Sequence, residues 1–294
     1  MLIFSCLGSK IKIILPDKKY MNNLIFRMER FCPSIEIDLS DDTFDYEIEC
    51  SKRTSNRNEY RIFKKKTTLY SNWDTDYSAF LAKYTTQIFQ MLLNKQQIYI
   101  IPASCVIKDG KALLFLGDFW QGKTSAALSV LSLDKSIKLV SDNYIAVSNN
   151  YVIWWTKYLS LREENTERYK HIIKSQKAKT VDSRNFFKFK TSKTKWEIIG
   201  FVIPYINNWD DNFHILPDHD ALRYLYQKFS RIINWDTLLF NWDIPSPNFD
   251  TKILAKNRLI FTKQILNNNL YYASADIMKI ANYSLDLLKN KNHE

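Results

Sequence analysis

The sequence is poor in glycine, cysteine and histidine, and these shortages limit the kinds of site that it can form. Five of the 294 residues are glycine, and cysteine and histidine occur four times each. The cysteines are widely spaced and form no Cys-x-x-Cys pair, so the sequence predicts neither a zinc site nor a disulfide framework. Internal repeats and low-complexity linkers are also absent. A function that rests on cysteine ligands or on disulfide bonds is therefore not expected.

Long hydrophobic runs are missing as well. No stretch approaches the ~20 apolar residues that a helix needs to cross a bilayer. The opening Met-Leu-Ile-Phe-Ser-Cys-Leu-Gly is too short for a signal peptide and lacks its cationic leader. We therefore expect no membrane span and a cytoplasmic location.

Hydrophobic and basic residues, in contrast, are abundant. Hydrophobic residues make up 46% of the chain and aromatic ones 15%, which excludes disorder as the main state. A chain of 294 residues can bury a large core and can hold two domains. The net charge is +11, so we expect anionic partners such as a nucleotide, an acidic peptide or a nucleic acid.

Three of the five glycines lie within residues 110–122, around one motif. Residues 117–124 read Gly-Asp-Phe-Trp-Gln-Gly-Lys-Thr and fit the phosphate-loop (Walker A) pattern G-x-x-x-x-G-K-S/T at every fixed position. Such a loop needs a buried strand before it and a helix after it, because its amides must converge on the phosphates at a helix N-terminus. Residues 112–116 are a short apolar run typical of a buried strand, and residues 123–131 have alanine and leucine at helical spacing. The sequence therefore predicts a P-loop that binds a nucleotide.

The motif assigns roles to the polar positions of the loop. Lys123 would contact the β and γ phosphates of ATP or GTP, and the Thr124 hydroxyl would ligate Mg²⁺. Asp118 places a negative charge near phosphate, which weakens binding unless the carboxylate faces solvent or metal. An ordinary glycine turn before a helix is the plainer alternative. The residues expected to bind the nucleotide are Gly117, Gln121, Gly122, Lys123, Thr124 and Ser125.

A P-loop of this kind usually works with a second acidic group at the end of a neighbouring strand, which holds the metal directly or through water. Residues 137–141 have the pattern of an apolar strand, and Asp142 and Asn143 follow it. We expect Asp142 to be the general base or a metal ligand, with Asn143 in support. The expected metal site is then Thr124, Asp142 and Asn143. An Asp-Asn turn after a strand is the alternative interpretation.

These segments, taken in order, resemble the HPr kinase-like family, whose nucleotide-binding core is akin to that of phosphoenolpyruvate carboxykinase. In that family a His-Ala-Ser-x-Val strand, a glycine turn and a second apolar strand lead into the phosphate loop, and an Asp-Asp or Asp-Asn pair follows. Residues 158–164, Tyr-Leu-Ser-Leu-Arg-Glu-Glu, are similar to a later segment of HPr kinase-related proteins, including those encoded with peptide natural-product enzymes. The other segments that carry the resemblance are residues 101–106, 108–111, 117–124, 141–143, 198–203 and 268–272.

The resemblance implies an α/β (α+β) fold with a mixed β-sheet around the P-loop, and an ATP-dependent kinase that uses Mg²⁺. Kinases of the family transfer phosphate to a serine hydroxyl of a protein, a peptide or a small molecule. With Asp142 as the general base or metal ligand, Arg162 would stabilise charge on the transferred phosphoryl group and Glu163 would orient the acceptor or the metal. The alternative for Arg162 and Glu163 is a charged first turn of a solvated helix. Pro102 stands where the family has histidine, and its side chain can neither accept a hydrogen bond nor titrate.

We expect a smaller N-terminal α+β domain, residues 1–95, followed by the kinase-like domain, residues 96–294. Residues 234–250 have the composition of an ordered loop or short helix, which we place over the acceptor site. Period-two alternation predicts strands with one wet face at residues 11–15, 34–39, 45–50 and 59–63. The predicted helices lie within residues 17–31, 77–94, 218–233 and 276–289.

Two other functions stay open. The chain could be a nucleotide-binding regulator or assembly subunit that no longer transfers phosphate, which Pro102 supports. It could also be an NTPase stimulated by nucleic acid, because Phe186, Phe187 and Phe189 interleave with lysines along residues 170–195 and aromatic rings can stack on bases. A solvated strand or loop is the plainer interpretation of that segment, and no recognised nucleic-acid module is present. An oligomer is compatible with each of these functions.

Overall fold

The computed structural model of the chain divides into two compact units. Met1–Tyr99 and Ser230–Arg258 form the first unit, and Ile100–Phe229 and Leu259–Glu294 form the second. The chain therefore leaves the first unit, returns to it once and leaves again. The residues that the structure describes are 1–38, 43–53, 58–73, 77–118, 121–156, 158–173, 177–181, 184–188, 195–234, 238–239, 244–245 and 247–289.

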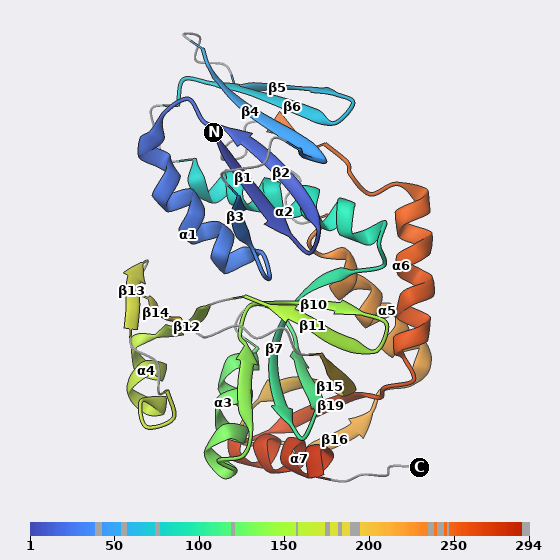
Figure 1. The fold of residues 1–294 in the computed structure, drawn as a ribbon. Coiled ribbons are helices and arrows are strands. Elements are labelled where there is room, and N and C mark those ends of the chain that lie inside the picture. The colour runs from blue at the N-terminus through green and yellow to red at the C-terminus, as the bar shows by residue number, and fades with distance from the viewer. Residues whose placement is uncertain are drawn as a thin grey trace. The chain divides into compact units, whose positions relative to one another are not determined.

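A mixed sheet of six strands is the basis of the first unit (Figure 1). Its strands are β1 (Leu2–Cys6), β2 (Ser9–Ile14), β3 (Glu36–Asp38), β4 (Tyr46–Lys52), β5 (Glu59–Phe63) and β6 (Lys66–Ser71). They are ordered β3-β1-β2-β4-β6-β5, and β2, β4 and β6 are parallel to one another. Buried and part-exposed side chains alternate along these three parallel strands. The alternation confirms the wet face predicted for the strands at residues 11–15 and 45–50, whereas β5, predicted at residues 59–63, has no buried side chain.

Helices pack beside this sheet. The short 3-10 helix η1 (Lys18–Tyr20) leads into α1 (Met21–Phe31), which packs against α2 (Ser78–Asn94). Both longer helices were predicted from their spacing, whereas strands β1 and β6 were not. Two short strands of the returning segment, β17 (Leu238–Leu239) and β18 (Ile244–Pro245), pair with each other. An ordered loop or short helix was expected for residues 234–250, of which 235–237, 240–243 and 246 lie outside the described residues.

The second unit is built on an eight-stranded mixed sheet. Its strands are β7 (Tyr99–Lys108), β8 (Lys111–Leu116), β9 (Lys138–Ser141), β10 (Tyr144–Ser148), β11 (Tyr151–Trp155), β15 (Trp196–Ile206), β16 (Asn212–Ile215) and β19 (Leu270–Ala275). The main order is β11-β10-β7-β8-β15-β19-β16, and β9 pairs with β7. β8, β15 and β19 run parallel, so their carboxyl ends lie at one edge of the sheet. That edge is where ligands bind in open α/β sheets.

Helix α3 (Lys123–Leu133) packs against α7 (Ile277–Lys289), and both contact β8 and β15. Apolar side chains of these elements form one continuous core. Helix α5 (Asp218–Ser230) belongs to this unit, and α6 (Lys252–Ile265) continues into it from the first. The helices predicted at residues 218–233 and 276–289 are confirmed. None of the helices in the described part of the chain is long and apolar enough to cross a membrane.

A smaller sheet of three strands, β12 (Tyr158–Arg162), β13 (Lys177–Val181) and β14 (Arg184–Lys188), accompanies helix α4 (Glu163–Tyr169). Phe186 and Phe187 of β14 are buried. Neither ring is therefore available to stack on a base, which corrects the expectation for this basic and aromatic segment, and the third ring, Phe189, lies outside the described residues. The described elements together form a mixed α+β fold, as expected.

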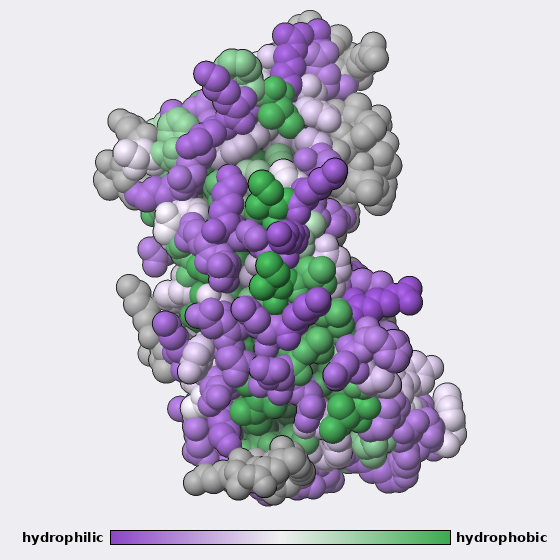
Figure 2. Space-filling view, turned by 90° about the vertical axis from the view of Figure 1, so that its right-hand side faces the viewer, coloured by the Kyte–Doolittle hydropathy of each residue, from purple (hydrophilic) through white to green (hydrophobic). Residues whose placement is uncertain are grey.

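Polar and charged side chains cover most of the face shown in Figure 2, and hydrophobic ones lie in separate groups between them. Helix α6 contributes exposed hydrophobic side chains of Ile253, Leu259 and Ile260. Scattered apolar side chains of this kind are normal on a folded protein and by themselves indicate no binding site.

Candidate functional site

The predicted phosphate loop lies between a buried strand and a helix. β8 ends at the fully buried Leu116, and α3 begins at Lys123. Gly122 has a φ of 81°, a conformation that glycine adopts without strain, and a Cβ there would collide with Ile206 at the end of β15. A Cβ at Gly117 would lie 2.6 Å from Gln121 Oε1, the end of a side chain that can move. Packing therefore restricts Gly122 more than Gly117.

Polar groups of the loop bind one another. The Lys123 ammonium donates to the carbonyl oxygen of Asp118 at 2.7 Å, and the Asp118 amide donates to Gln121 Oε1. The Gln121 side chain thus lies across Gly117, close to the space that a phosphate would take in a P-loop. Binding of a nucleotide would require the two donors, the Lys123 ammonium and the Asp118 amide, to exchange these partners for phosphate oxygens. Phe119 and Trp120 in the middle of the loop lie outside the described residues.

The carboxylate of Asp118 has a partner that the sequence did not indicate. Lys228, near the end of α5, places its ammonium 2.8 Å from Asp118 Oδ1 and 4.6 Å from the ring centre of Tyr224. The Lys228 side chain is only 6% exposed, whereas that of Asp118 is 59% exposed. Lys228 therefore compensates the negative charge that seemed unfavourable for phosphate binding.

Asp142 directly follows β9 and is buried, with 5% of its surface exposed. Its Oδ1 accepts hydrogen bonds from the hydroxyls of Thr124 and of Ser104, the latter at 3.3 Å. Its Oδ2 accepts the backbone N–H of Ser160 at 3.1 Å. Helix α3, strand β7 and strand β12 thus each direct a donor at one carboxylate. The two predicted metal ligands Thr124 and Asp142 are in direct contact.

Burial raises the pKa of Asp142, because a charged carboxylate is poorly solvated there. The hydrogen bonds from Thr124 and Ser160, and the charges of Lys123 and Arg184, act in the opposite direction. Asp142 is therefore a buried acid whose ionisation depends on neighbouring donors and cations. Acids with perturbed pKa values of this kind are frequent at functional sites.

Arg184 is a second cation that the sequence did not single out. From β14 its guanidinium donates to the Ser160 hydroxyl at 3.2 Å, and its charge acts on Asp142. The pairing of β12 with β14 places Arg184 directly opposite Arg162. Nη1 of the Arg162 guanidinium lies 3.8 Å from Oε1 of Glu164. Glu163 is exposed in the first turn of α4. The exposed first turn matches the alternative interpretation of this segment, while strand β12 keeps Arg162 close to Ser160.

The remaining predicted residues support the site through the backbone. Asn143 donates its side-chain amide to the carbonyl of Tyr158 at 3.2 Å, and its own carbonyl accepts the amide of Ala103 at 3.1 Å. Asn143 thus links strands β7 and β12 on either side of Asp142. The carbonyl of Ser125 accepts the Tyr169 hydroxyl at 3.3 Å, which connects the first turn of α3 to α4.

The donor set at this position is suited to Mg²⁺. A hydroxyl and one carboxylate meet at the start of α3, and Mg²⁺ is commonly held by one or two carboxylates together with phosphate oxygens of the substrate. Among the described residues, no group of three or more His, Cys, Asp or Glu side chains could hold a metal ion without such help. Thr124 and Asp142 could hold Mg²⁺ together with water and phosphate ligands.

No protein-family model matches this chain, and no curated protein matches it either. The functional assignment therefore rests on the motif and on the arrangement of the residues around it.

Proposed function

We propose that the chain is an ATP-dependent kinase of the HPr kinase-like type, with Mg²⁺ as its cofactor. The observation that carries the proposal is the contact between Thr124, in the first turn of the helix after the glycine motif, and the buried carboxylate of Asp142. In P-loop enzymes a hydroxyl and an acid in these positions hold the metal that bridges the phosphates. ATP and GTP both fit the motif.

The residues would divide the work of phosphoryl transfer. Lys123 and the loop amides would hold the β and γ phosphates, and Thr124 would ligate Mg²⁺. Asp142 would hold the metal or accept the proton of the acceptor hydroxyl, depending on which group lies nearer in the bound state. Arg184, together with Arg162 on the opposite strand, would stabilise charge on the transferred phosphoryl group. The acceptor is a hydroxyl, which we take to be of serine type, on a peptide, a protein or a small metabolite.

The experiment that tests the proposal is a mass-resolved incubation of the protein with Mg²⁺, ATP or GTP, and a pool of hydroxyl-bearing peptides and metabolites. A kinase adds the mass of one phosphate to an acceptor. Asp142→Asn should lower the rate of transfer about 10²- to 10⁴-fold, the usual contribution of a proton-transfer group. Its affinity for ATP without metal should change little, because Lys123 and the loop are untouched.

Asp134→Asn is the matched control. Asp134 follows the other end of α3, where its carboxylate pairs with Lys108 at 2.8 Å. This variant also removes an acid from an element end, yet it should transfer phosphate at the wild-type rate. Equal activity of the wild type and Asp142→Asn would refute the assignment of Asp142.

A second function, nucleotide binding without transfer, is favoured by Pro102. The pairing of Ala103 with Leu116 puts Pro102 beside the start of the glycine motif, at the place where the kinase family carries histidine. A regulator or assembly subunit would bind ATP, lose binding in Lys123→Ala, and show neither hydrolysis nor a phosphorylated acceptor in the same incubation.

A further inference from the structure

A turn beside the phosphate loop carries the most exposed large hydrophobic side chain among the described residues. Trp209 is 84% exposed, and it follows Tyr205 and Ile206, which are 47% and 40% exposed. A single exposed aromatic residue needs no explanation by itself. Trp209, however, lies beside the phosphate loop on a fixed backbone.

The position follows from the strand register. β15 lies parallel to β8, with Val202 beside Phe115, so β15 continues beyond the end of β8 and runs alongside the loop. Ile206, its last residue, lies against Gly122, which immediately precedes Lys123. Trp209 is three residues further along the chain. The turn that carries Trp209 therefore borders the phosphate loop, on the side of β8 opposite to β7 and Asp142.

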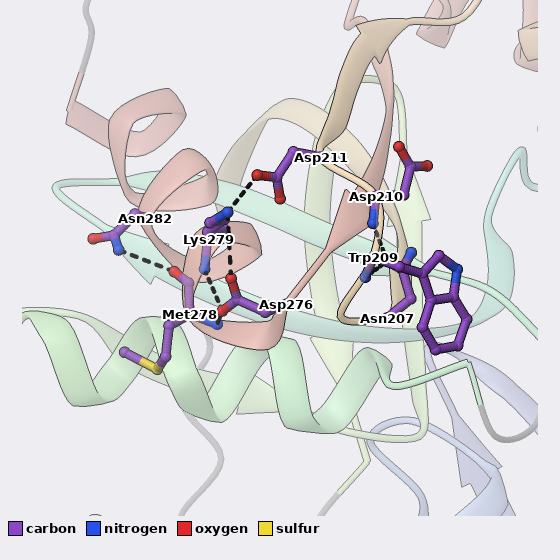
Figure 3. Close-up of polar contacts among 8 residues, drawn as sticks. All are labelled: Asn207, Trp209, Asp210, Asp211, Asp276, Met278, Lys279 and Asn282. Carbon is purple, nitrogen blue, oxygen red and sulfur yellow. Dashed lines mark hydrogen bonds and ion pairs between the residues drawn. The ribbon is translucent and has the colours of Figure 1, made fainter.

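The backbone of this turn is held in place. Asn207 is buried, and its side-chain oxygen accepts the backbone N–H groups of Trp209 and Asp210 at 3.1 and 2.8 Å. Its amide donates to the hydroxyl of Ser274 on β19 at 2.6 Å, and that hydroxyl donates to Asp210 at 3.0 Å. The neighbouring Asp211 pairs with a lysine of α7 (Figure 3). The acids of the turn are thus engaged with their own partners.

The Trp209 ring extends from this fixed turn on the side away from the ion pair with α7 (Figure 3). Because the backbone of Trp209 is already ordered, only its side-chain torsions need to be fixed when a flat ligand stacks on the ring. A nucleotide held by its phosphates at the loop carries one flat group, the base. Stacking of bases on aromatic rings is favourable and largely independent of the base.

We propose that Trp209 is the stacking platform for the base of the nucleotide whose phosphates bind the loop at residues 117–124. The proposal rests on the proposed nucleotide-binding function and adds a base subsite to it. Because stacking does not depend on which base is present, the platform would accept adenine and guanine alike. Ile206, which lies against Gly122, would provide an apolar border of the subsite.

The test is calorimetric titration of the full chain with Mg-ATP and, separately, with tripolyphosphate, which has the phosphates and no base. Trp209→Ala should weaken ATP binding about ten-fold, in the range expected for loss of one stacking ring, and should leave tripolyphosphate affinity unchanged. Trp209→Phe keeps an aromatic ring and should restore most of the ATP affinity. Phe63→Ala is the matched control, since Phe63 is 72% exposed on β5 of the first unit.

Each outcome separates this inference from the function on which it rests. ATP affinity of Trp209→Ala equal to that of the wild type overturns the platform, and so does an equal loss for ATP and tripolyphosphate, which would indicate a disturbed loop. Failure of Trp209→Phe to recover ATP binding counts against stacking in the same way. A wild-type protein that binds no ATP would instead refute the nucleotide-binding function itself.

Discussion

Replacement of Gly122 by alanine tests whether the loop conformation depends on the packing that the structure shows. Gly122 has a φ of 81°, and an added Cβ would meet the Cδ1 and Cγ1 atoms of Ile206. Gly110, in the turn between β7 and β8 of the same unit, has nearly the same φ, 80°, but nothing lies within 4 Å of its added Cβ. The two glycines thus differ in packing and hardly at all in backbone conformation.

The free energies of unfolding follow from this difference. An alanine held in the left-handed region costs about 1 to 2 kcal/mol, so Gly110→Ala should lose about that much. Gly122→Ala has the same backbone cost and an overpacking cost of about 1 to 3 kcal/mol. We expect the lower end, about 1 kcal/mol, because Ile206 is 40% exposed and can move partly into solvent. Changes in the entropy of the unfolded chain are alike for both variants and cancel in the comparison.

Urea titration of both variants, each alone and combined with Ile206→Ala, measures the two costs separately. In the Ile206→Ala background the clash is gone, so Gly122→Ala and Gly110→Ala should become equally destabilising. The reasoning fails if Gly122→Ala costs no more than Gly110→Ala in the wild-type background. It also fails if the difference persists after Ile206 has been shortened.

Two further predictions concern buried charges. Since burial raises the folded-state pKa of Asp142, its stabilising contribution is complete below its ordinary pKa of about 3.9 and is lost as the pH rises. Metal-free Asp142→Asn should therefore gain stability relative to the wild type as the pH rises above about 4 in urea titrations, and a constant difference would contradict this. Asp118→Ala should lower the free energy of unfolding by about 1 to 3 kcal/mol, because it leaves the buried Lys228 ammonium without its countercharge. Lys228→Met removes the ammonium from the exposed Asp118 carboxylate, so it should lower the free energy of unfolding by less. Equal losses in the two variants would contradict the explanation that the cost comes from the buried ammonium.

Much of the local structure could be predicted from the sequence, because hydrophobic spacing reports directly on helices and half-buried strands. The helix expected at residues 218–233 is α5, Asp218–Ser230, and the alternation at residues 45–50 became β4. Strand β1 was missed because its run, Leu2–Cys6, does not alternate and was considered only as a leader segment. The order of the strands could not be predicted either, since pairing depends on contacts between distant parts of the chain.

The candidate site, too, could be predicted from the sequence only in part. Thr124 and Asp142 were predicted as a pair because the motif fixes one and the end of an apolar strand fixes the other. Lys228 was not predicted, because it is separated from Asp118 by 110 positions and because a lysine on an amphipathic helix usually faces solvent. Arg184 lay in a segment rich in basic residues, where no local pattern distinguishes a cation that faces an acid from one that faces water.

The return of residues 230–258 to the first unit has a consequence for how the chain acquires its structure during translation. The ribosome releases Met1–Tyr99 early, but the segment that completes this unit emerges only after most of the second unit has been made. The second unit in turn lacks β19 and α7 until residues 270–289 have been synthesised. Neither unit can therefore reach its full set of contacts before the other is nearly complete. A cut between Phe229 and Ser230 leaves both units unfinished, so proteolytic or genetic dissection must keep the two segments of a unit together.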